Sequence, residues 1–438
     1  MESFQDAHYY KLPNQGNIYS FTNLQLTNGM NKVLIAILKR KIFCCELING
    51  VDGSLKPCVK EVPFTYIPPG AEIISIDSFN RSSTRDDFFI GIAIIKNKHF
   101  QVNNDQSAET YLNVYTEQEI EEGADLNLES IAQNCLMLEL TFTPYHLIHT
   151  YLINMDFSKE VVWLMSGSDL KVHLFREDPQ NHTYCETDIS DAFPEFSSLP
   201  SVVLWIDVKH TRDLKRRLTA FGCECGFAKF VLVDSLNGTT LQSFSEQYDA
   251  PISSVLLFSL ENTATPRLPL THTSSDRTIA AKLFHEVTEI SYNLLIMNSL
   301  HPAVVFMNIL ENGFNEKHQL PDSDKYDTPL CICHADINMD MQHELLIGTF
   351  AQALLLYRFD GKWILEGTHK FPHALHSINY IDITGDGVNE LIVVTMSGIH
   401  IFQHKPPQTL KLFNERLKIL ENILRNQNCE EKDDILAI

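Results

Sequence analysis

Pairs of apolar runs recur along the chain, and the two runs of each pair are separated by a short turn of small or polar residues. The runs are rich in Val, Ile, Leu and Phe and are bounded by Gly, Asn or Asp, which is typical of β-strands. Seven pairs occur, near residues 31–47, 88–115, 161–175, 217–234, 292–308, 344–359 and 390–402. They start about 60 residues apart on average. The pattern therefore predicts seven β-hairpins.

Several hairpins follow a further apolar run that ends in an aspartate, at Asp77, Asp207, Asp336 and Asp382. A sheet of three or four strands cannot bury both faces alone, so the copies must pack radially or in two layers. A period near 60 residues fits a propeller blade with polar loop insertions better than a sandwich does. We therefore predict an all-β fold, a seven-bladed β-propeller over residues 1–405, with two stacked β-domains as the alternative.

Two dipeptides, Asn237-Gly238 and Asp360-Gly361, have the composition of tight hairpin turns. A two-residue turn of type I′ requires positive φ at both positions, which Asn, Asp and Gly tolerate best. We therefore expect type I′ turns at both places.

The C-terminal segment has a different period. After Pro406-Pro407, apolar residues recur at spacings of 3, 4, 3 and 4, at Leu410, Phe413, Leu417, Leu420 and Leu424. This spacing predicts an amphipathic helix over residues 406–428, followed by an acidic tail at 429–438. A lone helix of this length is marginal in water, so the stripe must dock, either on the chain's own propeller or on a helix of another subunit.

Charge narrows the choice of partners. The chain has 34 Lys and Arg residues against 56 Asp and Glu residues, a formal net charge of −22. Such a surface repels nucleic-acid phosphates and anionic lipid headgroups. We therefore expect no nucleic-acid partner and no direct insertion into a membrane.

Cysteine usage and the chain termini bear on the compartment. The CxC pairs Cys223-Cys225 and Cys331-Cys333 lie in apolar runs, where residues i and i+2 share one face of a strand. They lack the CxxC knuckles of zinc modules and are interpreted as buried, reduced thiols. No signal peptide and no apolar run of ~18 residues is present. We expect an intracellular protein without a membrane span.

Catalytic motifs are missing from the sequence. There is no GxSxG, no P-loop and no GxGxxG before a helical pattern, and His285–Glu289 lacks the second His of HExxH. We therefore predict a non-enzymatic protein and assign no catalytic residue, no cofactor-binding residue and no cofactor.

One loop carries the ligand types of a hard cation. Asp382, Thr384, Asp386 and Glu390 surround a glycine directly before an apolar run. Oxygen ligands at this spacing suit Ca²⁺, but the same side chains also cap the turn without a metal. An earlier copy, with Asp336, Asn338, Asp340 and Glu344, has Met341 where the glycine belongs. We favour turn capping and assign no metal site.

Polar insertions between the hairpins are candidate partner surfaces. Residues 117–129 carry six carboxylates and no basic residue, and 177–201 and 261–291 are similar insertions. The run 209–217 is the main cationic cluster. Residues 117–129 and 209–217 are each interpreted first as a solvated loop and second as a contact for a partner of opposite charge. The insertions 177–201 and 261–291 are interpreted as surface segments used for partner contact.

The aspartate loops resemble the FG-GAP repeats of integrin-α-type propellers, and longer stretches are similar to the kaptin family. The stretches that carry this resemblance are YIPPGAEIISIDSFN (66–80), LNLESIAQNCLMLELTFTPY (126–145), SVVLWIDV (201–208), PISSVLLFSL (251–260), LPDSDKYD (320–327) and YIDITGDGVNELIVVTMSGIHIFQH (380–404). The similarity runs in order from about residue 17 to residue 404. The chain departs from the family at Met341, where the family has glycine, and after Cys429, where an acidic tail replaces a basic one.

The resemblance implies a subunit of the KICSTOR complex, which tethers the GATOR complex to lysosomes and restrains the TOR kinase when amino acids or glucose are scarce. The implied partners are a second FG-GAP propeller protein, a helical subunit, a large scaffold subunit and GATOR. The implied location is cytoplasmic, at the lysosomal membrane through partners.

The same resemblance implies an alternative, because the family is also associated with actin at lamellipodia and stereocilia. The run 209–217 would then be the surface that meets acidic actin. A third interpretation, an ectodomain like that of integrin α, is disfavoured by the missing signal peptide.

Overall fold

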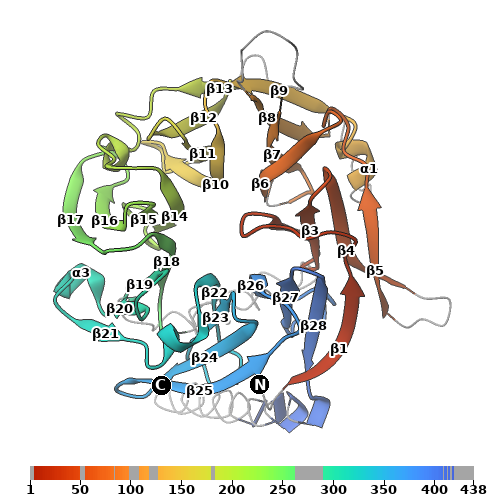
Figure 1. The fold of residues 1–438 in the computed structure, drawn as a ribbon, viewed down its shortest axis with the longest axis vertical. Coiled ribbons are helices and arrows are strands. Elements are labelled where there is room, and N and C mark those ends of the chain that lie inside the picture. Colours follow the sequence, from red (N-terminus) through yellow and green to blue (C-terminus); the bar gives the residue numbers. More distant parts are fainter. Residues whose placement is uncertain are drawn as a thin grey trace, which may run out of the picture.

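The computed structural model describes residues 4–49, 55–82, 84–97, 108–117, 127–178, 183–261 and 290–407, with 409–411, 413–414 and 417–418. Within these residues, 28 strands form seven four-stranded antiparallel sheets that are arranged as a ring (Figure 1). The first strand of each sheet lies toward the axis and contacts the first strand of the next sheet. The prediction of a seven-bladed β-propeller is confirmed.

The blades are numbered in chain order, and their strands run from the axis outward. Blade 1 comprises β2 (Phe21–Gln25), β3 (Asn31–Ile37), β4 (Lys41–Asn49) and β5 (Leu55–Val62). Blade 2 comprises β6 (Ala71–Asn80), β7 (Phe88–Lys96), β8 (Glu109–Thr116) and β9 (Cys135–Leu140). Blade 3 comprises β10 (Pro144–Ile153), β11 (Lys159–Gly167), β12 (Val172–Asp178) and β13 (Thr183–Thr187). Blade 4 comprises β14 (Val203–His210), β15 (Arg216–Cys223), β16 (Phe227–Asp234) and β17 (Thr240–Gln247).

The remaining blades follow the same order. Blade 5 comprises β18 (Ile252–Phe258), β19 (Asn293–Asn298), β20 (Val304–Phe306) and β21 (Lys317–Gln319). Blade 6 comprises β22 (Pro329–Ala335), β23 (Glu344–Thr349), β24 (Ala353–Phe359) and β25 (Trp363–Lys370). Blade 7 comprises β26 (Leu375–Ile381), β27 (Glu390–Thr395), β28 (Gly398–His404) and β1 (Phe4–Lys11). Short helices in the connections are α1 (Leu128–Ile131), η1 (Pro194–Phe196), α3 (Ile309–Asn312) and η2 (Ser323–Tyr326).

Each hairpin identified in the sequence coincides with the second and third strands of one blade. Neighbouring blades cover both faces of these middle strands, and every residue of β19, β23 and β27 is buried. The middle strands are therefore continuous apolar runs in the sequence. The fourth strands face solvent on one side and alternate instead, as in β17 and β25. The apolar runs before the hairpins are the first strands.

The last blade is completed by the N-terminus of the chain. Strand β1 pairs antiparallel with β28, from Phe4 opposite His404 to Lys11 opposite Gly398. Phe4 is buried in the same apolar cluster as Phe402 and Leu391. The two ends of the propeller are thereby joined in one sheet (Figure 1). Hydrophobic periodicity did not indicate this pairing, because β1 is largely polar.

The connection between β1 and β2 reaches across the axis of the ring. The Tyr19 hydroxyl donates a hydrogen bond of 2.6 Å to the carbonyl of Leu204 in blade 4. The Tyr19 ring stacks on His146 of blade 3 at 5.0 Å between centroids, and His146 stacks on Trp205 at 4.6 Å. Burial lowers the pKa of His146 to about 4, so this imidazole is neutral at ordinary pH. These contacts tie blades 1, 3 and 4 together near the centre.

The two predicted hairpin turns form, but they are not of type I′. Gly238 and Gly361 both have positive φ, whereas Asn237 and Asp360 do not. The loop before β17 has five residues, 235–239, and Asp234 shapes it by accepting hydrogen bonds from two of its backbone amides. The Asp234 side chain thus stabilises a longer loop, in which Asn237 does not need a positive φ.

Candidate functional site

The aspartate loop of blade 7 is organised by hydrogen bonds from its own backbone. Asp382 accepts from the amide of Gly385 at 2.6 Å and from the amide of Gly387 at 2.8 Å. Asp386 accepts from the amide of Val388 at 2.8 Å. Glu390, the first residue of β27, accepts from the amide of Ile383 at 3.0 Å. The carboxylates therefore cap the turn, as the sequence predicted.

The loop of blade 6 has a similar arrangement without either glycine, since Met339 and Met341 stand where blade 7 has Gly385 and Gly387. Asp336 accepts from the amides of Asp340 and Met341 at 2.9 and 3.0 Å. Glu344 accepts from the amide of Ile337 at 3.0 Å. Met341 takes the conformation that glycine has in blade 7, with φ of 74°, and its side chain is exposed. A bulky residue is tolerated here because it faces solvent.

Burial and neighbouring carboxylates dominate the electrostatics of both loops. Burial raises the pKa of Glu344 and of Glu390 to about 7, and the loop aspartates add to this effect. Within the described residues, no group of three or more His, Cys, Asp or Glu side chains is arranged to hold a metal ion. Both oxygens of Asp382 and one oxygen of Glu390 accept hydrogen bonds from backbone amides of the turn.

We expect Asp382→Ala to lower the free energy of unfolding by about 1–3 kcal/mol, because two backbone hydrogen bonds of the loop are lost at about 0.5–1.5 kcal/mol each. Asp386→Ala should cost less, since Asp386 accepts one amide hydrogen bond at an exposed position. Thermal denaturation of both variants, in excess calcium and in chelator, is the measurement. A loss of stability confined to calcium-containing buffer would show a metal site instead.

The basic run 209–217 is not a continuous solvated patch. Its ends belong to strands β14 and β15, and Arg217 is buried. Arg217 pairs with Glu195 through hydrogen bonds of 3.1 and 3.0 Å, donates to the carbonyl of Ala192, and lies 4.1 Å from the ring centroid of Phe193. The interpretation of the whole run as a loop is therefore wrong, because one arginine neutralises a buried carboxylate.

The insertion 177–201 is also more structured than expected. It contains β13, and it ends in a segment whose side chains Phe193, Glu195 and Phe196 are buried against blade 4. Sequence reasoning treated this segment as a surface loop because its composition is polar. Glu195 is buried through its pair with Arg217, and Phe193 and Phe196 are buried in the apolar cluster between blades 3 and 4.

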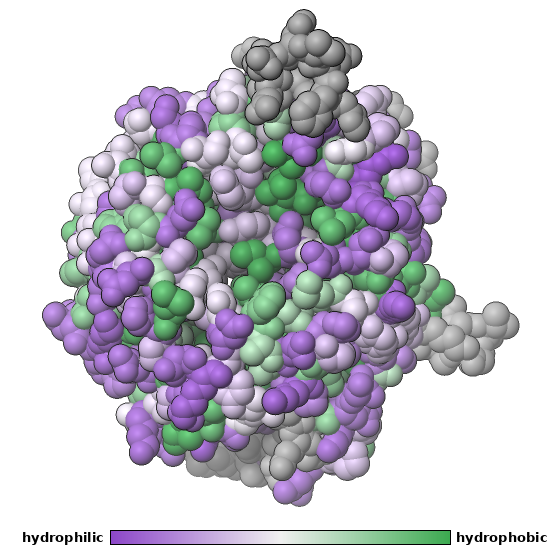
Figure 2. All heavy atoms as spheres, viewed as in Figure 1, coloured by the Kyte–Doolittle hydropathy of each residue, from purple (hydrophilic) through white to green (hydrophobic). Residues whose placement is uncertain are grey.

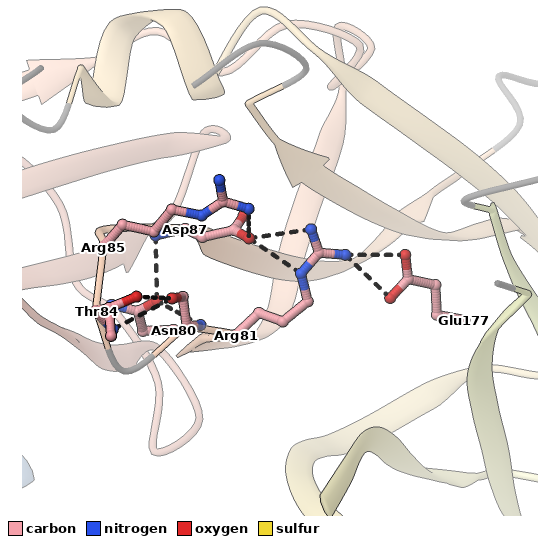
Figure 3. Close-up of polar contacts among 7 residues, drawn as sticks. Asn80, Arg81, Thr84, Arg85, Asp87 and Glu177 are labelled. Atoms are coloured by element: carbon pink, nitrogen blue, oxygen red, sulfur yellow. Dashed lines mark hydrogen bonds and ion pairs between the residues drawn. The ribbon is translucent and has the colours of Figure 1, made fainter. Parts of the chain in front are cut away.

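A groove of about 610 Å³ lies between blades 2 and 3. Its wall includes Arg81, whose guanidinium lies between Asp87 and Glu177 (Figure 3). Arg81 is 3.0 Å from Asp87 and 3.1 Å from Glu177, and its guanidinium lies 5.0 Å from the ring centroid of Phe89. Since Asp87 belongs to blade 2 and Glu177 to blade 3, this arginine joins two blades at the edge of the groove.

The groove has no catalytic constellation among the described residues that line it. No histidine lines it, and its one cysteine, Cys135, has a pKa raised to about 11 by burial. A nucleophilic cysteine acts as the thiolate, which this environment disfavours. The charge of Arg81 is already balanced by two carboxylates. Polar and apolar side chains both line the groove, and none of those described has the lowered pKa or the paired base of a catalytic nucleophile.

The cysteine pairs differ from one another. Cys331 and Cys333 lie on β22, and burial raises the pKa of Cys333 to about 12. Cys223 is buried at the end of β15, but Cys225 is exposed in the following turn. Burial is confirmed for Cys223 and Cys331, Cys333 is partly buried, and the prediction is wrong for Cys225, because the strand ends before it. The cysteines within the described residues are free thiols.

The C-terminal stripe is exposed wherever the structure describes it. The described residues of 406–418 are helical, and the exposed fractions of Leu410, Phe413 and Leu417 are 60%, 57% and 42%. Several predictions lie outside the described residues: Leu420 and Leu424, the tail 429–438, most of 117–129, and 262–289 with its His285 motif. No described helix is long and apolar enough to cross a membrane.

The surface in Figure 2 is mainly hydrophilic and is hollowed at the centre of the ring. Its hydrophobic side chains form separate small groups rather than one continuous patch. A closed ring of seven blades, with capped loops and a groove that lacks activated side chains, defines a β-propeller scaffold.

Comparison with known proteins narrows this class to a family. The family model for KICSTOR complex protein kaptin matches residues 4–414. The KICSTOR complex protein kaptin of Mus musculus is 34% identical over 417 residues, which cover 94% of this chain and 90% of that protein. The chain belongs to the kaptin family.

Solved structures agree on the fold alone. BBS1N in complex with ARL6DN, in crystals soaked with mercury, superposes with a TM-score of 0.52 at 10% identity, covering 92% of this chain and 97% of BBS1N. The crystals soaked with lead give a TM-score of 0.51 over the same coverage.

Proposed function

We propose that this chain is a non-catalytic protein-interaction subunit of a KICSTOR complex. In that role it contributes a rigid propeller to the assembly that tethers the GATOR complex to lysosomes and restrains TOR kinase signalling when amino acids or glucose are scarce. The observation that carries the proposal is membership of the kaptin family over nearly the whole chain. The name of that family includes the complex.

Two structural observations support an interaction role. The interblade groove has a cysteine with a raised pKa and an arginine that is already paired, which suits a scaffold better than an enzyme. Three apolar side chains of the C-terminal helix, Leu410, Phe413 and Leu417, are exposed to solvent. Apolar side chains on one helical face are a common means of docking on a partner helix.

Affinity purification of the full chain from cells tests the proposal. We expect a second FG-GAP propeller protein, a helical subunit, a large scaffold subunit and GATOR components to co-purify. Sedimentation of the purified chain with actin filaments tests the alternative, in which Lys209, Arg212, Lys215 and Arg216 would meet acidic actin. Sedimentation with filaments, together with absence of every KICSTOR subunit from the purified material, would reject the proposal.

The C-terminal helix gives a sharper test of subunit contact. We expect Leu410→Ser with Leu417→Ser to remove one co-purifying subunit while leaving the melting temperature unchanged, because each buried leucine contributes about 1.5–3 kcal/mol to an interface. Lys411→Ser with Lys418→Ser has the same spacing on an adjacent line of the helix and serves as the control. A drop in melting temperature with all subunits retained would show that the helix packs on its own propeller.

A further inference from the structure

Four turns between second and third strands present exposed apolar side chains. They are Leu38, Leu170, Leu300 and Phe350, with exposed fractions of 42%, 47%, 73% and 53%. Because every blade has the same strand order, these turns lie on one face of the ring. Leu300 and Phe350 are the two most exposed of the four, and they belong to neighbouring blades 5 and 6 (Figure 1).

One connecting segment is bonded to both turns that carry Leu300 and Phe350. Residues 320–328 lead from β21 of blade 5 to β22 of blade 6. At one end, the amide of Leu320 donates to the carbonyl of Ala303 at 2.8 Å, next to the turn that carries Leu300. At the other end, the amide of Phe350 donates to the carbonyl of Thr328 at 2.9 Å. The two apolar side chains therefore flank this connection.

The same connection is acidic. Asp322, Asp324 and Asp327 are exposed on it, and Lys325, which pairs with Asp322 at 2.7 Å, is its one basic residue. Asp249, in the preceding connection, has a side chain that is 94% exposed and lies 3.9 Å from His301, the neighbour of Leu300. Four exposed carboxylates thus lie on the two connections next to the turns that carry Leu300 and Phe350.

The other two apolar side chains have basic residues beside them in the chain. Leu38 is followed by Lys39 and Arg40, and Leu170 lies between Asp169 and Lys171. These turns have the same position in the blade as those of Leu300 and Phe350, their apolar side chains are also exposed, and each has a lysine next to the leucine. They provide the control for any effect of an apolar side chain alone.

We propose that Leu300, Phe350, Asp249, Asp322, Asp324 and Asp327, together the blade 5–6 surface, dock a segment of another protein that carries apolar residues beside Lys or Arg. Exposed apolar side chains of this kind mark protein contacts, and the carboxylates steer a basic partner and fix its register. Nucleic acids and anionic lipids are repelled by the same carboxylates, so the occupant is a polypeptide. The inference rests on one part of the proposed function, which is that the chain acts by binding proteins.

Hydrogen exchange of the full chain with synthetic peptides tests the proposal. The probes are an amphipathic helical peptide of leucine and lysine, a leucine–glutamate peptide and a serine–lysine peptide. We expect the leucine–lysine peptide alone to protect residues 299–303, 320–328 and 350–352. Protection spread over the ring, or equal for the serine–lysine peptide, would show charge attraction without docking and would overturn the proposal.

Matched variants test the residues. We expect Leu300→Ser with Phe350→Ser, and Asn at the four aspartates, each to weaken binding of the leucine–lysine peptide about tenfold or more. Leu38→Ser with Leu170→Ser should leave it unchanged. Equal weakening by both serine pairs would overturn the proposal. Affinity purification tests the proposed function, and hydrogen exchange with the peptides tests the docking surface. The result of one experiment therefore does not depend on the result of the other.

Discussion

Arg217→Ala should lower the free energy of unfolding by about 3–5 kcal/mol, because it leaves a buried carboxylate without a cation. The side chains of Arg217 and Glu195 are 2% and 0% exposed, and Glu195 also accepts a hydrogen bond of 2.7 Å from Thr219. Removal of the guanidinium also frees the carbonyl of Ala192. Urea denaturation at neutral pH measures the loss.

The adjacent residue provides the control. Arg216 is exposed, so Arg216→Ala should change the free energy of unfolding by about 0.5 kcal/mol or less. Arg217→Met with Glu195→Leu should recover much of the stability lost in Arg217→Ala, since a buried ion pair can be replaced by apolar side chains at little cost. Equal stabilities of Arg216→Ala and Arg217→Ala would contradict the buried pair.

Deletion of residues 1–11 should abolish cooperative unfolding and expose apolar surface. Strand β1 is the fourth strand of blade 7, and its loss leaves the edge of β28 unpaired and Phe402 uncovered. An unpaired strand edge promotes association between molecules. Light scattering and calorimetry are the measurements.

A peptide of residues 4–12 added in trans distinguishes closure from a general effect of truncation. We expect it to restore a cooperative transition, because it supplies Phe4 and the pairing partners of β28. A variant that lacks only residues 1–3 should behave as the full chain does. Cooperative unfolding of the longer deletion without peptide would mean that blades 1 and 7 hold the ring closed on their own.

The sequence by itself determined the repeated unit and the number of blades. Second and third strands are covered on both faces by neighbouring blades, so their apolar runs stand out in every repeat, as in β23 and β27. The turn-capping role of Asp382 and Glu390 was also readable, because each bonds to amides within eight residues of itself along the chain. The type I′ conformation expected at Asn237-Gly238 and Asp360-Gly361 was wrong, although a turn forms at each place.

Only the tertiary structure decided which polar residues are buried and how the ring closes. Arg217 looked like part of a solvated basic run because its partner, Glu195, lies in another segment with polar composition. Strand β1 pairs with β28 across nearly the whole length of the chain, and Tyr19 bonds to Leu204 across the axis. Hydrophobic periodicity shows which strands are buried, but it does not identify the distant partner of a polar side chain or of a polar strand, which depends on how the blades are brought together in the ring.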